Sequence, residues 1–587
     1  MTDEHKISSA YQSLLQGRIG RREFLTLATQ IGLSATAAAN LAGCAAQGTA
    51  PKSARKPNII LILVDDMGFS DLGFMGSEIR TPNIDGIAAR GAAMTSMYNA
   101  ARCCPTRSSL LTGMYPHKAG IGHMGSNLGT PAYQGYLRDD TATIAEALRP
   151  AGYRTLMAGK WHVGGDLWAT RVPTWTLGAP GFPTPLQRGF DHYYGMIDGV
   201  THYYSPWYIM EDDHRAEVSP TDFYFTDAIT DKAITMIEAS VRDDKPFFLY
   251  LAHAAPHWPL HAPEESVARY DSAYSKGWDA LRGARYEETR ARKILQHDWT
   301  MSPRDPDVVA WQDAPAKSWE ARRMAVYAAQ IDRLDQQIGR VFDTLRRLGQ
   351  FDDTLVFFFS DNGGCAEPMR AEGWGKFYPS VTNDGRKIAI GNRQDVMPGG
   401  PQSFMSYEQS WANVSNAPFR FFKHYTHEGG ISTPLLAQWP ATMRPQGILH
   451  APCHVTDILP SILEAAGAHY PTELDGHALQ RPDGESLIPL LSGKPWLRQQ
   501  PLFWEHEGNA AARVGNLKLV RQFDRPWELY DMERDRTELN NLATRNAPLV
   551  RDLESQYKRW AESIGVIDWK IQQPKLLKAW GISNPQG

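Results

Sequence analysis

The sequence contains few cysteines and no excess of either charge. Only five of its 587 residues are cysteines (Cys44, Cys103, Cys104, Cys365 and Cys453), which is too few and too irregular for a disulfide framework. The 61 Lys and Arg residues nearly balance the 65 Asp and Glu residues, and neither sign runs in long blocks. We therefore expect no nucleic-acid partner. With 42% hydrophobic and 21% charged residues, the composition excludes a mainly disordered chain.

The sequence also lacks a hydrophobic run that could span a bilayer, because its N-terminal apolar stretch, Leu27–Ala42, is too short and too polar. Arg21-Arg22 precedes this stretch and resembles a twin-arginine export signal. The stretch ends in Leu41-Ala42-Gly43-Cys44, which resembles a bacterial lipoprotein box. We expect residues 1–44 to form the signal and 45–57 a tether. The resemblance implies export by the twin-arginine machinery to the periplasm or cell surface, with a lipid anchor at Cys44.

From Asn58 onward, apolar runs alternate with amphipathic segments, which predicts an α/β fold with a mostly parallel sheet. Buried strands are predicted at 59–64, 153–157, 246–251, 354–359 and 434–439. Helices are predicted at 83–90, 142–151, 318–348 and 456–466.

The pattern changes in two later parts of the chain. Residues 367–418 are rich in Gly, Pro, Asn and aromatics without a period, which predicts a long structured loop of the kind that shapes binding sites. Beyond about residue 467, short predicted strands and a final helix at 548–564 indicate a small antiparallel α+β unit. We therefore expect a catalytic domain at 58–467 and a C-terminal subdomain at 468–587. Its strands are predicted at 502–506, 512–514, 517–520 and 527–530.

Chemically active residues follow four of the predicted strands. These residues are Asp65-Asp66, Lys160-Trp161-His162, His257 and Asp361-Asn362. Taken one at a time, they also fit a helix cap, a turn, a solvated lysine or a packed histidine. Ligands of open α/β sheets bind at the carboxyl ends of the strands, so four such ends together favour a functional site.

Four of these residues offer only oxygen ligands: Asp65, Asp66, Asp361 and Asn362. Because no Cys or His stands beside them at zinc-ligand spacing, the set favours a hard divalent cation such as Ca²⁺ or Mg²⁺. Lys160 and Lys423 would add positive charge. A metal and two ammonium groups suit an anionic substrate such as a phosphate or a sulfate.

The most informative segment is residues 102–113, RCCPTRSSLLTG. Pro105 suits the first turn of a helix and Gly113 its end, so Cys103 would lie at the helix N-terminus with Arg107 one turn further on. One interpretation is a capped helix with a buried cysteine pair. The other is a nucleophile in an anion-binding position, where free amides and the helix dipole favour negative charge.

The run Cys103-Cys104-Pro105-Thr106-Arg107 followed by Leu-Leu-Thr-Gly resembles the sulfatase signature, in which the first cysteine is oxidised to formylglycine by a maturation enzyme. Further segments stand in the family's order: 157–162 (MAGKWH), 255–260 (APHWPL), 360–363 (SDNG), Lys423 with 428–430, and 528–542. The chain most resembles bacterial arylsulfatases of the alkaline phosphatase superfamily. The resemblance implies a large mixed sheet between helices, with a small antiparallel sheet and one helix.

The resemblance also implies a mechanism. The four oxygen-bearing residues would hold Ca²⁺, with Mg²⁺ or Mn²⁺ as alternatives. The cation would bind the sulfate and the hydrated aldehyde at position 103. The metal and Arg107 would lower the pKa of one hydroxyl of the hydrate, which attacks sulfur. Lys160 and Lys423 would neutralise the sulfuryl oxygens.

The remaining steps are proton transfers. His257, assisted by Lys423, would protonate the leaving alcohol, and His162 would deprotonate the second hydroxyl so that sulfate is expelled. The substrate would be a small aryl or sugar sulfate, given Trp258 and the aromatic residues between 374 and 411. Two alternatives stay open: a formylglycine-dependent phosphonate or phosphate ester hydrolase, and a non-catalytic surface binder of sulfated ligands.

Overall fold

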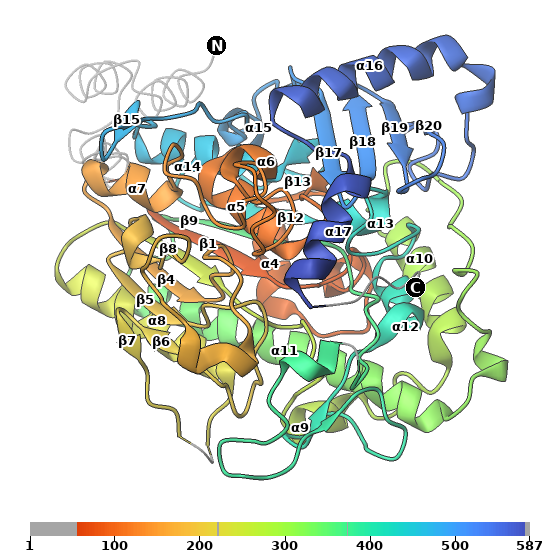
Figure 1. The fold of residues 1–587 in the computed structure, drawn as a ribbon, viewed down its shortest axis with the longest axis horizontal. Helices are drawn as coiled ribbons and strands as arrows, with labels where there is room; N and C mark the ends of the chain where they lie inside the picture. Colours follow the sequence, from red (N-terminus) through yellow and green to blue (C-terminus); the bar gives the residue numbers. More distant parts are fainter. Residues whose placement is uncertain (1–55, 220–221, 373, 582–587) are drawn as a thin grey trace, which may run out of the picture. The chain divides into compact units, whose positions relative to one another are not determined.

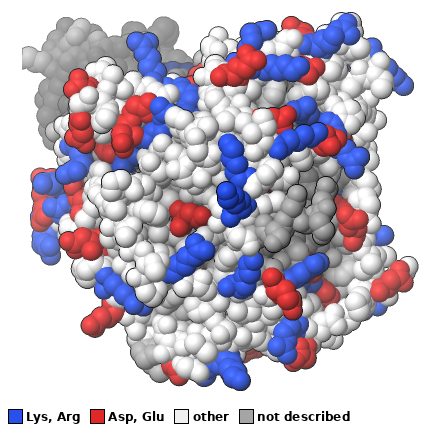
Figure 2. Space-filling view, in the orientation of Figure 1, with Lys and Arg blue, Asp and Glu red and all other residues white. Residues whose placement is uncertain are grey.

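The computed structural model describes residues 56–219, 222–372 and 374–581. The expected export signal, the Cys44 anchor and most of the tether lie outside these residues. Within this part of the chain, no helix is both long and apolar enough to cross a membrane. On the face shown in Figure 2, basic and acidic side chains are interspersed rather than gathered by sign.

A ten-stranded mixed sheet forms the centre of the described residues (Figure 1). Its four middle strands are parallel, in the order β9 (Thr354–Ser360), β1 (Asn58–Val64), β8 (Phe247–Ala252) and β4 (Arg154–Gly159). β12 (Leu435–Gln438) runs antiparallel to β9 and makes the sheet mixed. The other strands are β13 (Gly447–Leu449), β2 (Ala92–Met94), β5 (His192–Gly195), β6 (Met210–Glu211) and β7 (His214–Arg215).

Successive side chains of β1 point to opposite faces of the sheet, and helices cover both faces. Ile60, Ile62 and Val64 belong to one core and Ile59, Leu61 and Leu63 to the other. α4 (Pro82–Arg90), α8 (Phe225–Arg242) and α11 (Lys317–Arg347) pack on the first face, and α5 (Cys103–Thr112), α7 (Ile144–Leu148) and α14 (Ile458–Ala466) on the second. Burying an aliphatic side chain adds about 1.5–3 kcal/mol to the free energy of unfolding. A strand that is covered on both faces therefore favours apolar residues at every position. The predicted sandwich is confirmed.

Some predicted boundaries were wrong. The helix predicted at 142–151 is α7 only to Leu148, and a 3₁₀ turn, Arg149–Ala151, follows, because Pro150 cannot continue an α-helix. The loop at 367–418 contains a helix, α12 (Glu408–Ser415). α8 and α10 (Gly277–Ala291) were not predicted.

The C-terminal region contains an antiparallel sheet of β17 (Leu502–His506), β18 (Asn509–Val514), β19 (Leu517–Arg521) and β20 (Glu528–Asp531). α16 (Ala547–Ser563) covers one face, where Ala510 and Ala512 meet Tyr557. Ala511, between them, faces the other way and packs against residues such as Tyr98. A further helix, α17 (Trp569–Ala579), was not predicted.

Candidate active site

Helix α5 presents Cys103 at its N-terminus, as predicted. Arg102 is the N-cap residue with extended backbone (φ −154°), and Cys103 is the first helical residue. The Thr106 hydroxyl accepts a hydrogen bond from the Ala100 amide at 2.9 Å and ties the preceding loop to the first turn. Gly113 ends the helix in the left-handed region (φ 68°), which glycine adopts without strain. Cys103 is thus 2% exposed and lies where the helix dipole favours negative charge.

The four predicted metal ligands meet at the ends of two neighbouring strands. β1 and β9 pair up to Val64 and Ser360, so Asp65-Asp66 and Asp361-Asn362 continue side by side. The Asp66 amide donates to Oδ1 of Asp361 at 3.3 Å. Nδ2 of Asn362 donates to Oδ1 of Asp66 at 2.6 Å. All four residues are at most 1% exposed.

Two buried cationic side chains, Lys160 and Arg107, contact the Asp65 carboxylate. Lys160, directly after β4, donates from Nζ to Oδ2 of Asp65 at 2.6 Å. Nη2 of Arg107 lies 3.2 Å from Oδ2 of Asp65 and 2.8 Å from Oδ2 of Asp361. Burial alone would raise the pKa of Asp65, but Lys160, His257 and Arg107 together lower it to about 2. Burial and the Asp65 charge outweigh Arg107 at Asp361 and raise the pKa of that carboxyl well above its usual range.

Two oxygens of this cluster have no hydrogen-bond partner although they are buried: Oδ1 of Asp65 and Oδ1 of Asn362. Unsatisfied buried acceptors are costly, and a hard cation is a partner that a carboxylate and an amide oxygen both suit. The cationic side chains are already paired with the carboxylates. The residues therefore fit a divalent cation that would give the site the positive charge needed for an anion.

Lys423 and His257 form the other side of the site. Nζ of Lys423 lies 3.0 Å from Oδ1 of Asp66 and 3.4 Å from Nε2 of His257. Nδ1 of His257 lies 2.6 Å from the Trp258 carbonyl oxygen, which can only accept, so we assign the ring proton to Nδ1. Nε2 is then the atom of His257 that can exchange a proton with a ligand.

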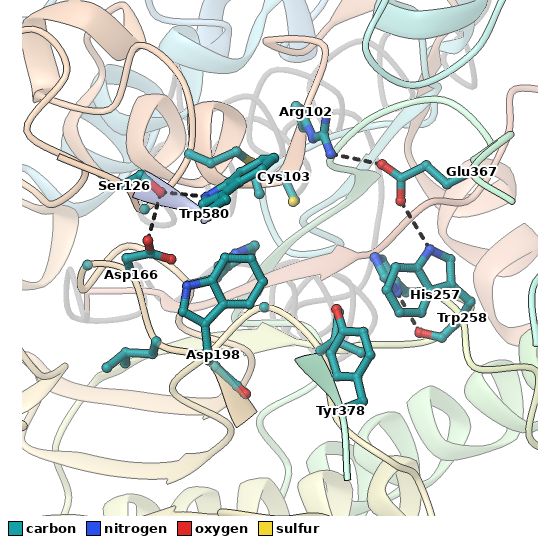
Figure 3. A pocket seen from close by; sticks show the side chains of 18 of the residues that line it. Arg102, Cys103, Ser126, Asp166, Asp198, His257, Trp258, Glu367, Tyr378 and Trp580 are labelled. Atoms are coloured by element: carbon teal, nitrogen blue, oxygen red, sulfur yellow. Dashed lines mark hydrogen bonds and ion pairs between the residues drawn. The ribbon is translucent and has the colours of Figure 1, made fainter. Parts of the chain in front are cut away.

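Cys103 and His257 line one cavity (Figure 3). His162 and Lys423 line the same cavity. A hydrogen bond from Cys104 and the charges of Lys160 and Lys423 outweigh burial and lower the pKa of the Cys103 thiol well below its usual range. Burial lowers the pKa of His162 to about 4. His162 is therefore neutral at pH 7 and can accept a proton beside position 103.

The structure thus brings all ten predicted site residues into one cluster, and it adds residues that the sequence did not indicate. Arg102 forms ion pairs with Glu367 at 2.8 Å and with Glu507 at 3.3 Å. Glu367 also accepts from Nε1 of Trp258 at 3.2 Å. Arg102 adjoins Cys103 and was detectable from its place in the motif, whereas its acidic partners come from distant loops without a pattern of their own.

Comparisons with known proteins identify the family of this chain. The Sulfatase family model matches residues 57–468, and the model for the C-terminal region of N-sulphoglucosamine sulphohydrolase matches residues 419–562. An uncharacterised sulfatase of Schizosaccharomyces pombe is 32% identical over 87% of this chain and 95% of its own length. An arylsulfatase of Klebsiella aerogenes is 35% identical over 70% of this chain and 87% of its own.

Among solved structures, Ps i-CgsB in complex with k-i-k-neocarrahexaose aligns with a TM-score of 0.61 and 25% identity. The alignment covers 87% of this chain and 94% of that one. The expected fold and enzyme class are thereby confirmed. This chain belongs to the type I sulfatase family of the alkaline phosphatase superfamily and is a sulfatase.

Proposed function

We propose that the protein is an arylsulfatase-like enzyme that hydrolyses sulfate monoesters to an alcohol and sulfate. It would use a formylglycine made from Cys103 and a bound Ca²⁺. The observation that carries this proposal is the position of Cys103. It starts helix α5 in the cavity that His162, His257 and Lys423 line. A maturation enzyme would convert its thiol to an aldehyde, whose hydrate supplies a nucleophilic hydroxyl.

Asp65, Asp66, Asp361 and Asn362 would hold the cation. When bound, the cation would supply positive charge for a sulfuryl oxygen and lower the pKa of a hydroxyl group next to it. Arg107 orients two of the carboxylates through the contacts of its Nη2 atom. Lys160, tied to Asp65 at 2.6 Å, would stabilise negative charge that develops on the sulfuryl group.

The proton transfers fall to the two histidines and Lys423. His257 would protonate the leaving alcohol from Nε2. Lys423, whose Nζ lies 3.4 Å from that nitrogen, would return a proton to it. His162, neutral at pH 7 because burial lowers its pKa to about 4, would take the proton from the second hydroxyl at position 103. Loss of that proton allows sulfate to leave.

The proposed substrates are small aryl or sugar sulfates. An arylsulfatase among the relatives and a carbohydrate-bound structure among the neighbours support this class. The protein would be matured in the cytoplasm before twin-arginine export, because the maturation enzyme acts on an unfolded chain. It would then reside in the periplasm or at the cell surface, anchored through Cys44.

The test compares kcat/KM for an aryl sulfate with kcat/KM for the matched aryl phosphonate and phosphate diester. We expect the sulfate ester to be preferred, and EDTA to abolish turnover until Ca²⁺ is restored. A preference for the phosphorus esters would establish the alternative hydrolase. No turnover of any ester, with tight binding of sulfated ligands, would establish the non-catalytic binder.

A further inference from the structure

The C-terminal helix α17 lies beyond both regions that the family models match, which end at residues 468 and 562. It is nevertheless packed against the body, because Trp569 and Leu576 form an apolar cluster with Leu128 and Tyr133. Figure 1 shows α17 as a separate helix below α16 and the C-terminal sheet. Its packing brings the next residue of the chain, Trp580, to the site.

Trp580 lines the same cavity as Cys103 and is held there by a relay of hydrogen bonds (Figure 3). Its indole Nε1 donates to Oγ of Ser126 at 2.9 Å, and Ser126 donates to Oδ2 of Asp166 at 2.7 Å. The indole also meets Trp168 edge to face, with ring centroids 6.0 Å apart. These contacts fix the plane of the Trp580 ring.

A second aromatic pair lines the cavity elsewhere. Trp258 and Tyr378 contact each other edge to face, with ring centroids 5.7 Å apart. Trp258 is fixed through its Nε1 bond to Glu367, which is in turn paired with Arg102. Figure 3 shows Trp580 on one side of Cys103 and Trp258 with Tyr378 on another.

We propose that this aromatic-walled cavity binds the leaving group of the ester. Trp580, which directly follows α17, makes the cavity selective for sulfate esters whose alcohol contains a six-membered ring. The inference rests on the proposed sulfate-ester hydrolysis. Fixed indole and phenol faces bind the apolar faces of an aryl or a pyranosyl ring at little cost in side-chain entropy. A ring bound there would lie next to position 103, where the ester bond is cleaved.

The test uses Trp580→Ala in the full-length chain, with Ile571→Ala as the matched control. Ile571 is 57% exposed on the same helix and does not line the cavity. The substrates are phenyl sulfate, glucose 6-sulfate and ethyl sulfate, and inorganic sulfate serves as a competitive inhibitor. We expect Trp580→Ala to lower kcat/KM by about 10- to 100-fold for a ring-bearing ester. Ethyl sulfate turnover and the sulfate inhibition constant should stay within about twofold, and the control should match the parent.

The ring ester that loses more identifies the source of the ring, aryl or sugar. An equal loss for ethyl sulfate, or no loss for either ring ester, would overturn the inference. If Trp580→Ala does not fold, Ser126→Ala releases the indole while leaving α17 intact and should show the same pattern with a smaller loss. A parent protein that cleaves none of the three esters would instead contradict the proposed function.

Discussion

If His257 protonates the leaving alcohol, its contribution to the rate should be larger for poor leaving groups than for good ones. His257→Gln removes the imidazole nitrogen Nε2, which would deliver the proton that a poor leaving group needs when the ester bond breaks. General acids contribute about 10²–10⁴-fold, or ~3–5 kcal/mol of activation free energy. Because Nζ of Lys423 lies 3.4 Å from Nε2 and can replace the donor, we expect the lower end, about 100-fold, for phenyl sulfate.

The same substitution should cost about tenfold or less with 4-nitrophenyl sulfate, whose leaving group departs as a stable anion. Steady-state kcat/KM for the two esters measures the difference, with the inhibition constant of inorganic sulfate showing that the anion site is intact. His297→Gln, at an exposed position, is the control. An equal loss with both esters would refute the assignment of His257 as the acid.

Three further results are expected. Cys103→Ser should release one alcohol per protein and then stop, because a serine ester lacks the second hydroxyl that expels sulfate; repeated turnovers would contradict the scheme. Asn362→Leu removes a buried, unpartnered oxygen and should weaken Ca²⁺ binding at least about tenfold, measured by thermal shift after EDTA treatment; unchanged affinity would exclude Asn362 as a ligand. The pKa of His162 is lowered to about 4, so protonation removes this base only at acid pH, and kcat should fall with a midpoint near pH 4. A midpoint near 6.5 in the parent protein, or the same acid limb in His162→Asn, would count against this role.

The core and the cluster of site residues were predictable because their signals are local. All six residues of the run from Ile59 to Val64 are aliphatic and four of them are β-branched, which predicts a buried strand. The corresponding strand β1 is buried on both faces. The four middle strands are parallel neighbours within the mixed sheet. Residues placed after each strand therefore had to converge at one edge.

The parts that were missed depend on distant contacts. α17 is not marked by a regular apolar period and contains Pro574; it is held by packing against residues 128–133, which no local pattern reveals. Trp580 reaches the cavity only through that packing. Glu367 and Glu507 were missed for the same reason, because they are far apart in the sequence and meet only at the partly buried guanidinium of Arg102.

The most direct test of the proposed function is the mass of the peptide that spans Cys103, isolated from catalytically active protein made in a host with a formylglycine-generating system. We predict an aldehyde at position 103, in proportion to the activity of the preparation. An intact thiol at Cys103 in a preparation that hydrolyses sulfate esters would contradict it.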